Sequence, residues 1–434
     1  MSANHPKTDK IIRNYLDKHL PDYVPAIEPA HDLALIVVIP VYREKDYIFR
    51  TIASLQQCIN PQKNVEVVLL FNASESAPES VVEEQKETAQ MVCTACFDSP
   101  VWLKFLVEEN YAIPKKHFGA GMARKAGMDI ALARLFAVGN SNGLIVTLDA
   151  DSQVTPNYFV EILKWFIFAK RNGATVYFEH PLSGNEFSPE VYDGIIQYEL
   201  HLRYYLQALR QTGFPYAFHT MGSAMVMRAS AYARAGGMVR KQAGEDFYFL
   251  QKLIPLGNFG EMHTTTVIPS PRPSERVIFG TGAAITKHLA GSNETALTYN
   301  YRAFADLKTF FDLRHELFNT DSILFEQWSL QLAEPLRHFL LNTNFITDVE
   351  TLKRECSSVE IFGKRFFELF NAFKVVKYLN CVHEKFYAKT SVIKAAQSYI
   401  GHDTEATAKW LLQEFRDIEK RNVFYFTEIT WNRV

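Results

Sequence analysis

Two aspartates separated by one residue, Asp149 and Asp151, follow a short apolar run in the sequence. Residues 143–148 are rich in β-branched side chains, which is typical of a buried strand, and the aspartates mark its carboxyl end. Side chains repeat every second residue in an extended segment, so both carboxylates should lie on one side, about 7 Å apart. Hard oxygen ligands at this spacing favour Mg²⁺ or Mn²⁺. The alternative is a solvated Asp-x-Asp turn without function.

A second acidic pair, Glu245 and Asp246, precedes apolar residues at helical spacing. The pair is therefore predicted in the first turn of an amphipathic helix. Carboxylates at that position complement the helix dipole, which alone would account for them. A carboxylate there could also act as a proton acceptor.

The composition limits the function classes. The chain has 434 residues, is 47% hydrophobic and carries a formal net charge of -2, so it has no basic field for a nucleic acid. Five cysteines and no apolar signal segment favour a reducing cytoplasm, and Cys93 and Cys96 are interpreted as structural. No stretch approaches the ~20 apolar residues of a membrane span, so the sequence predicts a soluble, cytoplasmic protein, at most peripheral to the inner face of a membrane.

The elements that would position these acids alternate between strand and helix. Apolar runs predict strands at 33–39, 66–71, 101–107 and 143–148, with helical spacing over 48–55 and 121–136. This alternation predicts an α/β fold with a doubly wound sheet, whose strand ends at Pro40, Asn72 and Asp149 share one edge. We expect a helix and linker at 1–31, a catalytic domain at 32–290 and an all-helical C-terminal domain at 291–434.

Five short segments together resemble the family 2 glycosyltransferases of the GT-A fold, over roughly residues 33–282. They occur in the family's order, at 40–44, 119–127, 149–151, 221–228 and 244–247. The resemblance implies a Rossmann-like doubly wound mixed sheet that binds a nucleotide sugar. It also implies a metal-dependent, inverting transfer of a sugar from a UDP- or GDP-linked donor to an acceptor hydroxyl, as in bacterial glycan or glycoconjugate synthesis. The acceptor would be a glycan, a lipid-linked molecule or a small molecule.

The resemblance also assigns roles to residues of this sequence. Asp246, next to Glu245, would be the catalytic base. The metal would be Mn²⁺ or Mg²⁺ on Asp149 and Asp151, with His263 or His288 as a candidate third ligand. The acceptor side would include Met221, Gly222 and Ser223. The donor side would comprise Pro40, Val41, Tyr42, Glu44, Asn72, Arg124, Lys125, Asp149, Arg272 and Arg276.

Three of these positions carry open alternatives. Asn72 stands where the family usually has an acidic residue that reads the base, and an amide could still bind a base edge. Lys125 replaces the usual Asn and is either a cation for a phosphate or a solvated helix residue. The segment with Arg272 and Arg276 is either a closing loop whose guanidinium groups bind phosphate or a plain surface loop.

Two other functions remain open from the sequence. Residues 148–152 also resemble the nucleophile motif of haloacid dehalogenase-type phosphohydrolases, although that motif normally opens the fold. The chain could also be a GT-A domain that binds a nucleotide sugar or a partner without turnover.

Overall fold

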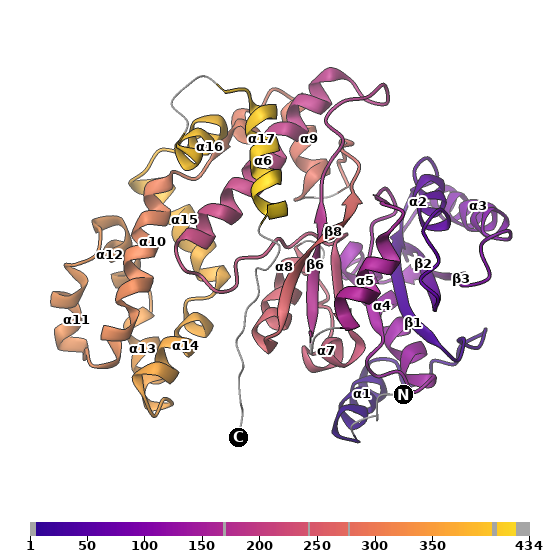
Figure 1. The fold of residues 1–434 in the computed structure, drawn as a ribbon, viewed down its shortest axis with the longest axis horizontal. Helices are drawn as coiled ribbons and strands as arrows, with labels where there is room; N and C mark the ends of the chain where they lie inside the picture. Colours follow the sequence, from indigo (N-terminus) through magenta and orange to yellow (C-terminus); the bar gives the residue numbers. More distant parts are fainter. Residues whose placement is uncertain (1–5, 168–170, 242–243, 277, 402–405, 422–434) are drawn as a thin grey trace. The chain divides into compact units, whose positions relative to one another are not determined.

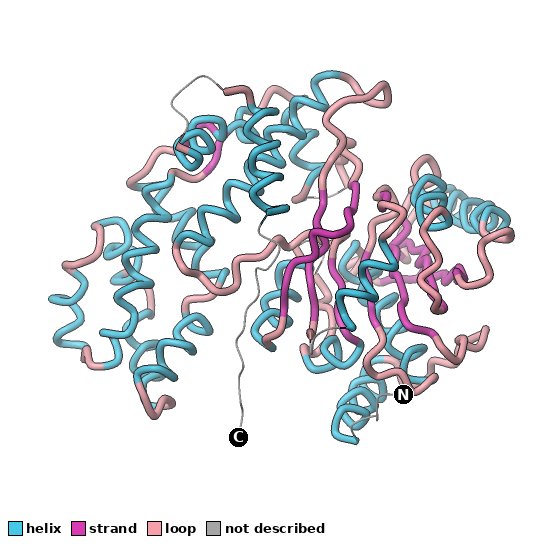
Figure 2. The backbone as a smooth tube through the Cα atoms, in the orientation of Figure 1, coloured by secondary structure: helices cyan, strands magenta, loops and turns pink. Residues whose placement is uncertain are grey.

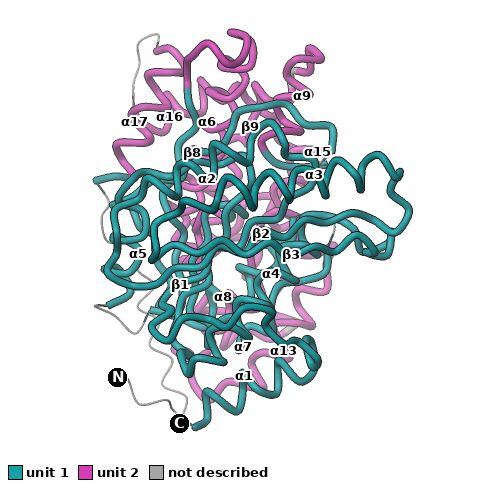
Figure 3. The backbone as a smooth tube through the Cα atoms, turned by 90° about the vertical axis from the view of Figure 1, so that its right-hand side faces the viewer, with its two compact units in different colours: residues 1–181, 220–280, 420–434 teal, residues 182–219, 281–419 magenta. Residues whose placement is uncertain are grey.

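A computed structural model describes residues 6–167, 171–241, 244–276, 278–401 and 406–421 (Figure 1). The chain divides into two compact units, coloured separately in Figure 3. Unit 1 comprises 1–181, 220–280 and 420–434, and unit 2 comprises 182–219 and 281–419. Unit 2 therefore takes a segment from within the predicted 32–290 domain. The predicted division at 31 and 290 stays a prediction.

Unit 1 is built on one eight-stranded mixed sheet, in the order β3-β2-β1-β4-β7-β6-β8-β5. Its strands are β1 (Leu33–Val41), β2 (Asn64–Ser74), β3 (Leu103–Ile113), β4 (Leu144–Thr147), β5 (Gln153–Val154), β6 (Gly173–Phe178), β7 (Met225–Arg228) and β8 (Phe259–Ile268). β3, β2, β1 and β4 are parallel, whereas β7 runs antiparallel to both β4 and β6. The predicted α/β class with a mixed sheet is confirmed.

The helices of unit 1 follow from the strand order, because parallel neighbours need a crossover. They are α2 (Ile48–Gln56), α3 (Glu79–Ala95), α4 (Ala120–Ala137), α5 (Tyr158–Ile167), α7 (Ala229–Arg234), α8 (Glu245–Leu253) and the 3₁₀ turn Ile254–Leu256. α4 lies close to β1, since a Cβ on Gly127 would come within 2.4 Å of Cγ1 of Val38. The carboxyl ends of β1, β2 and β4 consequently meet at one edge.

The N-terminal helix α1 (Pro6–His19) is anchored on unit 1 by Tyr15. The Tyr15 hydroxyl donates to Asp129 at 2.8 Å and accepts from Lys125 at 3.1 Å, and Tyr232 also donates to Asp129, at 2.7 Å. All four side chains are buried. Gly237 leaves room for the Tyr15 ring, because a Cβ there would lie 1.8 Å from its hydroxyl oxygen.

Unit 2 is mainly helical (Figure 2). Its helices are α6 (Pro189–Gln211), α9 (Thr281–Leu289), α10 (Tyr301–Leu313), α11 (Ser322–Ser329), α12 (Glu334–Leu341), α13 (Phe345–Arg354), α14 (Val359–Leu369), α15 (Ala372–Lys385), α16 (Val392–Ile400) and α17 (Ala408–Arg421). A short antiparallel pair, β9 (Leu297–Thr298) with β10 (Thr390–Ser391), adds to the predicted helices. In the described part of the chain no helix is long and apolar enough to cross a bilayer.

Two features hold unit 2 together. Phenylalanine rings on α10 and α14 meet in its core, with the ring centroids of Phe310 and Phe366 5.4 Å apart. Buried ion pairs also join α6 to the C-terminal helix, because Arg416 donates to both carboxylate oxygens of Glu199 at 2.8 Å. Apolar side chains of the helices after residue 291 thus form a core.

Candidate active site

The segment after β4 is a turn. The Ser152 N–H donates to the Asp149 carbonyl at 3.0 Å, and the strand itself ends at Thr147. The expectation that Asp149 and Asp151 share one side of an extended strand is therefore wrong, because the backbone bends between them. Each carboxylate instead contacts its own arginine.

Arg124 joins the two acidic pairs. Its Nη2 donates to Oδ1 of Asp149 at 2.7 Å, and its Nη1 donates to Oε1 of Glu245. The guanidinium is buried, as is Glu245, whereas the Asp149 side chain is 41% exposed. A buried arginine is stable only with charged partners, so these contacts fix the end of β4 against the start of α8.

Two glycines make room for this arrangement. A Cβ on Gly222 would lie 2.9 Å from Nη2 of Arg124, and a Cβ on Gly121 would lie 2.2 Å from the Lys241 carbonyl and 2.9 Å from Cβ of Glu245. The Gly222 carbonyl accepts from the Thr147 hydroxyl at 2.6 Å. Gly222 therefore lies against the Arg124 guanidinium, and Ser223 is buried next to it in sequence. The acceptor-side role of Met221, Gly222 and Ser223 stays a prediction.

Asp246 has the electrostatic environment of a proton acceptor. Its pKa is raised from 3.8 to about 6, chiefly by burial and also by the neighbouring charge of Glu245, while Arg124 opposes both effects. Its Oδ1 accepts from the Phe247 N–H at 2.7 Å, which orients the carboxylate at the first turn of α8. At neutral pH this carboxyl is mostly ionised, so it can accept a proton. Its pKa lies near neutral pH, which favours proton transfer.

Arg272 and Arg276 connect the other carboxylates. Nε of Arg272 donates to Oδ2 of Asp151 at 2.6 Å, and its Nη2 lies 2.7 Å from both carboxylate oxygens of Glu44. Nη2 of Arg276 reaches the same Glu44 at 2.7 Å. Burial raises the pKa of Asp151 to about 6, while Arg272 opposes the rise. The predicted loop arginines are thus brought together with Asp151 and Glu44.

Backbone and amide groups shape the ends of β1 and β2. Asn72 is buried, and its amide nitrogen donates to the Val41 carbonyl at 3.1 Å. The Tyr42 carbonyl accepts from Arg276, and the Tyr42 ring lies edge-on to Phe118 at 4.9 Å. Pro40 precedes them as the penultimate residue of β1.

Sequence reasoning missed two residues at this edge. Gln85 on α3 is buried, donates to the Val41 and Asn72 carbonyls at 2.9 Å, and accepts from the N–H of Arg43. The Tyr47 ring lies 4.3 Å from the guanidinium carbon of Arg272. No local pattern marks either one, because a lone Gln or Tyr on a helix or loop is ordinary.

Three predicted site residues are not brought together with the others. The Lys125 ammonium lies 2.5 Å from Asp129 in the buried contact with α1, so neither alternative from the sequence describes it well. His263 lies within β8, with Nε2 3.6 Å from Glu261 and its ring 5.8 Å from that of Tyr177. His288 lies 3.4 Å from Asp193 in unit 2. The proposed metal roles of His263 and His288 stay predictions.

The carboxylates of Asp149 and Asp151 suit a divalent ion. Among the residues that the structure describes, no three His, Cys, Asp or Glu side chains converge as a metal site. However, Mg²⁺ is commonly held by one or two carboxylates, with phosphates and water as the remaining ligands. Asp149 and Asp151, two aspartates on one turn at the strand end, meet that requirement.

No protein-family model matches the chain, and no curated protein matches its sequence. Solved structures do match. S. aureus TarS in complex with UDP-GlcNAc is 13% identical, with 90% of this chain and 89% of that chain covered and a TM-score of 0.38. The mannosyltransferase PcManGT from Pyrobaculum calidifontis, in complex with GDP-Man and Mn²⁺, is 12% identical, with 95% and 94% covered and a TM-score of 0.35. GalNAc-T7 with UDP, GalNAc and Mn²⁺ is 11% identical, with 87% and 67% covered and a TM-score of 0.36.

These matches are GT-A type glycosyltransferases, the class that the sequence motifs resemble. The TM-scores of these three matches lie below 0.5.

Proposed function

We propose that the protein is a metal-dependent, inverting glycosyltransferase that uses a UDP- or GDP-linked sugar donor. The observation that carries this proposal is the contact of Arg124 with both Asp149 and Glu245, which sets a strand-end aspartate beside the Asp246 carboxylate. Because the two aspartates lie in different environments, Asp246 suits proton transfer and Asp149 suits metal binding.

Asp246 is the general base in this proposal. It takes the proton of the acceptor hydroxyl as that oxygen attacks the anomeric carbon, and its pKa of about 6 suits proton transfer near neutral pH. Glu245 is bound to Arg124 and buried, so it positions the helix start and tunes Asp246. A single displacement from one side inverts the anomeric configuration.

Asp149 and Asp151 would hold the divalent ion. When bound, the ion supplies positive charge that stabilises the leaving diphosphate. The guanidinium groups of Arg272 and Arg276 are further phosphate ligands, since they can exchange the carboxylates that they contact here for phosphate oxygens.

The nucleoside would lie at the ends of β1 and β2. Pro40, Val41 and Tyr42 border this region, and Glu44 offers a carboxylate to ribose hydroxyls. Asn72 has its amide nitrogen engaged with the Val41 carbonyl, so base recognition would use its oxygen or neighbouring backbone groups.

The first test is thermal stabilisation by nucleoside diphosphates and nucleotide sugars, with and without Mn²⁺. Binding to the native state raises the melting temperature by mass action. We expect a Mn²⁺-dependent shift with one nucleotide that is lost in Asp151→Ala and kept in Asp98→Ala, an exposed aspartate on the α3–β3 loop. The absence of a shift with every nucleotide would refute the donor assignment.

Turnover separates the remaining functions. Metal-dependent cleavage of the donor, lost in Asp246→Asn when an acceptor is present, supports the transferase. Nucleotide binding without any cleavage would instead identify a non-catalytic binder. Hydrolysis of a phosphomonoester that requires Asp149 would identify a phosphohydrolase.

A further inference from the structure

β3 is the last strand of the sheet, on the side of unit 1 that faces the viewer in Figure 3. In the described part of the chain it pairs with β2 alone, in parallel, over residues 103–113. An edge strand presents unpaired backbone groups, and proteins usually protect such an edge with charges, bulges or covering elements. β3 carries the apolar sequence Phe105-Leu-Val107 at its centre.

A groove follows this open edge. A cavity of about 380 Å³ is lined by four consecutive residues of β3, 105–108. Side chains alternate between the two faces of a strand, so a cavity on one face would be lined by every second residue. Four consecutive lining residues place the cavity along the backbone edge itself. Its other walls are Ala26, Ile27, Cys93, Cys96, Phe97 and Arg134.

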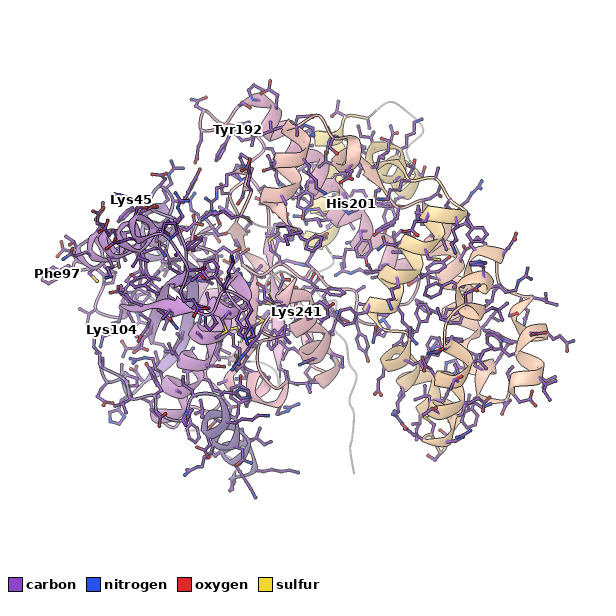
Figure 4. The ribbon with its side chains drawn as sticks, turned by 180° about the vertical axis from the view of Figure 1, so that it is seen from behind. Lys45, Phe97, Lys104, Tyr192, His201 and Lys241 are labelled. Atoms are coloured by element: carbon purple, nitrogen blue, oxygen red, sulfur yellow. The ribbon has the colours of Figure 1, made fainter. Side chains whose placement is uncertain are left out.

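The rim of the groove is apolar and exposed. The Phe97 side chain is 88% exposed and Ile27 is 50% exposed. Val101, fully exposed, lies just before β3. Figure 4 shows Phe97 and Lys104 on the same outer side of unit 1. Exposed large apolar side chains that gather at an open strand are typical of a contact surface.

The charges of β3 are complementary to those of a second β3. Lys104 and Glu108 point to the same face, because they are four positions apart in the strand and side chains repeat every second position. When two copies pair antiparallel about Leu106, each Lys104 lies opposite a Glu108, and each Phe105 lies opposite a Val107. Burial raises the pKa of Glu108, so its carboxylate gains from a cation placed opposite.

We propose that β3 is a homodimerisation edge, on which a second copy of the chain pairs antiparallel with Leu106 at the two-fold axis. The pairing continues the sheet across both copies and covers Phe97, Val101 and Ile27. A two-fold axis makes the contact isologous, so the same charge pair forms twice. This proposal is independent of the proposed enzymatic function.

Sedimentation velocity of the full chain over a range of concentrations tests the proposal. We expect wild type to sediment with twice the mass of one chain, 49.7 kDa. Lys104→Glu should weaken the dimer roughly tenfold or more, since two attractive pairs become repulsive. Glu108→Lys should have a similar effect, and the double variant Lys104→Glu/Glu108→Lys should restore the dimer, because the charges oppose each other again.

Lys63→Glu is the matched control, as an exposed lysine just before the neighbouring strand β2 with the same charge change. It should leave the dimer intact. Melting temperatures of all variants establish that they are folded. A wild-type monomer at every concentration would overturn the proposal. So would a dimer that both single variants leave unchanged, or a double variant that stays dissociated.

Discussion

The substitution Asp246→Asn should stabilise the protein while abolishing sugar transfer. The pKa of Asp246 is raised from 3.8 to about 6, so ionisation of this carboxyl is less favourable in the folded chain than in the unfolded chain. Asparagine keeps the oxygen that accepts from the Phe247 N–H and removes the charge that burial disfavours.

The magnitude follows from the two pKa values. A rise from 3.8 to about 6 corresponds to about 3 kcal/mol, and the partly exposed side chain is screened by solvent, so we expect a gain of about 1–3 kcal/mol at pH 8. The sign depends on pH. Below pH 3.8 the carboxyl is protonated in both states and the variant gains nothing. The advantage grows between pH 3.8 and about 6 and is constant above that pH.

Urea denaturation of wild type and variant from pH 4 to 8 measures this difference. The control is Glu245→Gln, which removes a carboxylate bound to the buried Arg124 and should destabilise the chain. Transfer activity of Asp246→Asn should fall by roughly 100- to 10,000-fold. A variant that is less stable than wild type at pH 8, or a difference that does not change with pH, would refute the reasoning.

Three further predictions concern the same unit. Arg124→Gln leaves Glu245 buried without its cation and Asp149 without its partner, so urea denaturation should show a loss of about 3–5 kcal/mol. Lys125→Met leaves Asp129 buried with hydroxyl partners only and should cost about 3 kcal/mol, yet the nucleotide-dependent thermal shift should remain. Loss of that shift would instead support the phosphate contact expected from the sequence. The transfer rate of wild type should rise with pH through about 6, as the proposed base ionises, and a rate that falls over this range would exclude a carboxylate base.

β1, β2 and β4 were predictable from sequence because these three strands are almost wholly buried on both faces. β1, β2 and β4 are continuous apolar runs, and their strand ends supplied the candidate site. β8 was not predicted, since Thr264, Thr265 and Thr266 interrupt its apolar pattern at an irregular stretch of its pairing with β6.

The contacts within the site were beyond the reach of local patterns. Arg124 lies 25 residues from Asp149 and 121 residues from Glu245 along the chain, and only the fold brings the three together. Motif spacing pointed to the acids and the arginines as site residues, but not to the contacts between them. Lys125 belongs to the same motif as Arg124 but lies outside the site. Adjacent helical residues point about 100° apart, so the Arg124 side chain enters the site whereas the Lys125 side chain contacts α1.

The anchoring of α1 makes this helix a part of the scaffold of the candidate active site. A chain trimmed to remove residues 1–20 loses the Tyr15 hydroxyl and leaves a polar hollow beside Gly237, where Lys125 and Asp129 face water. These losses affect the turn of α4 that also carries Arg124. Proteolytic removal of α1 would therefore disturb the site where the chemistry is proposed to occur. Truncated variants intended for assays should therefore begin before α1.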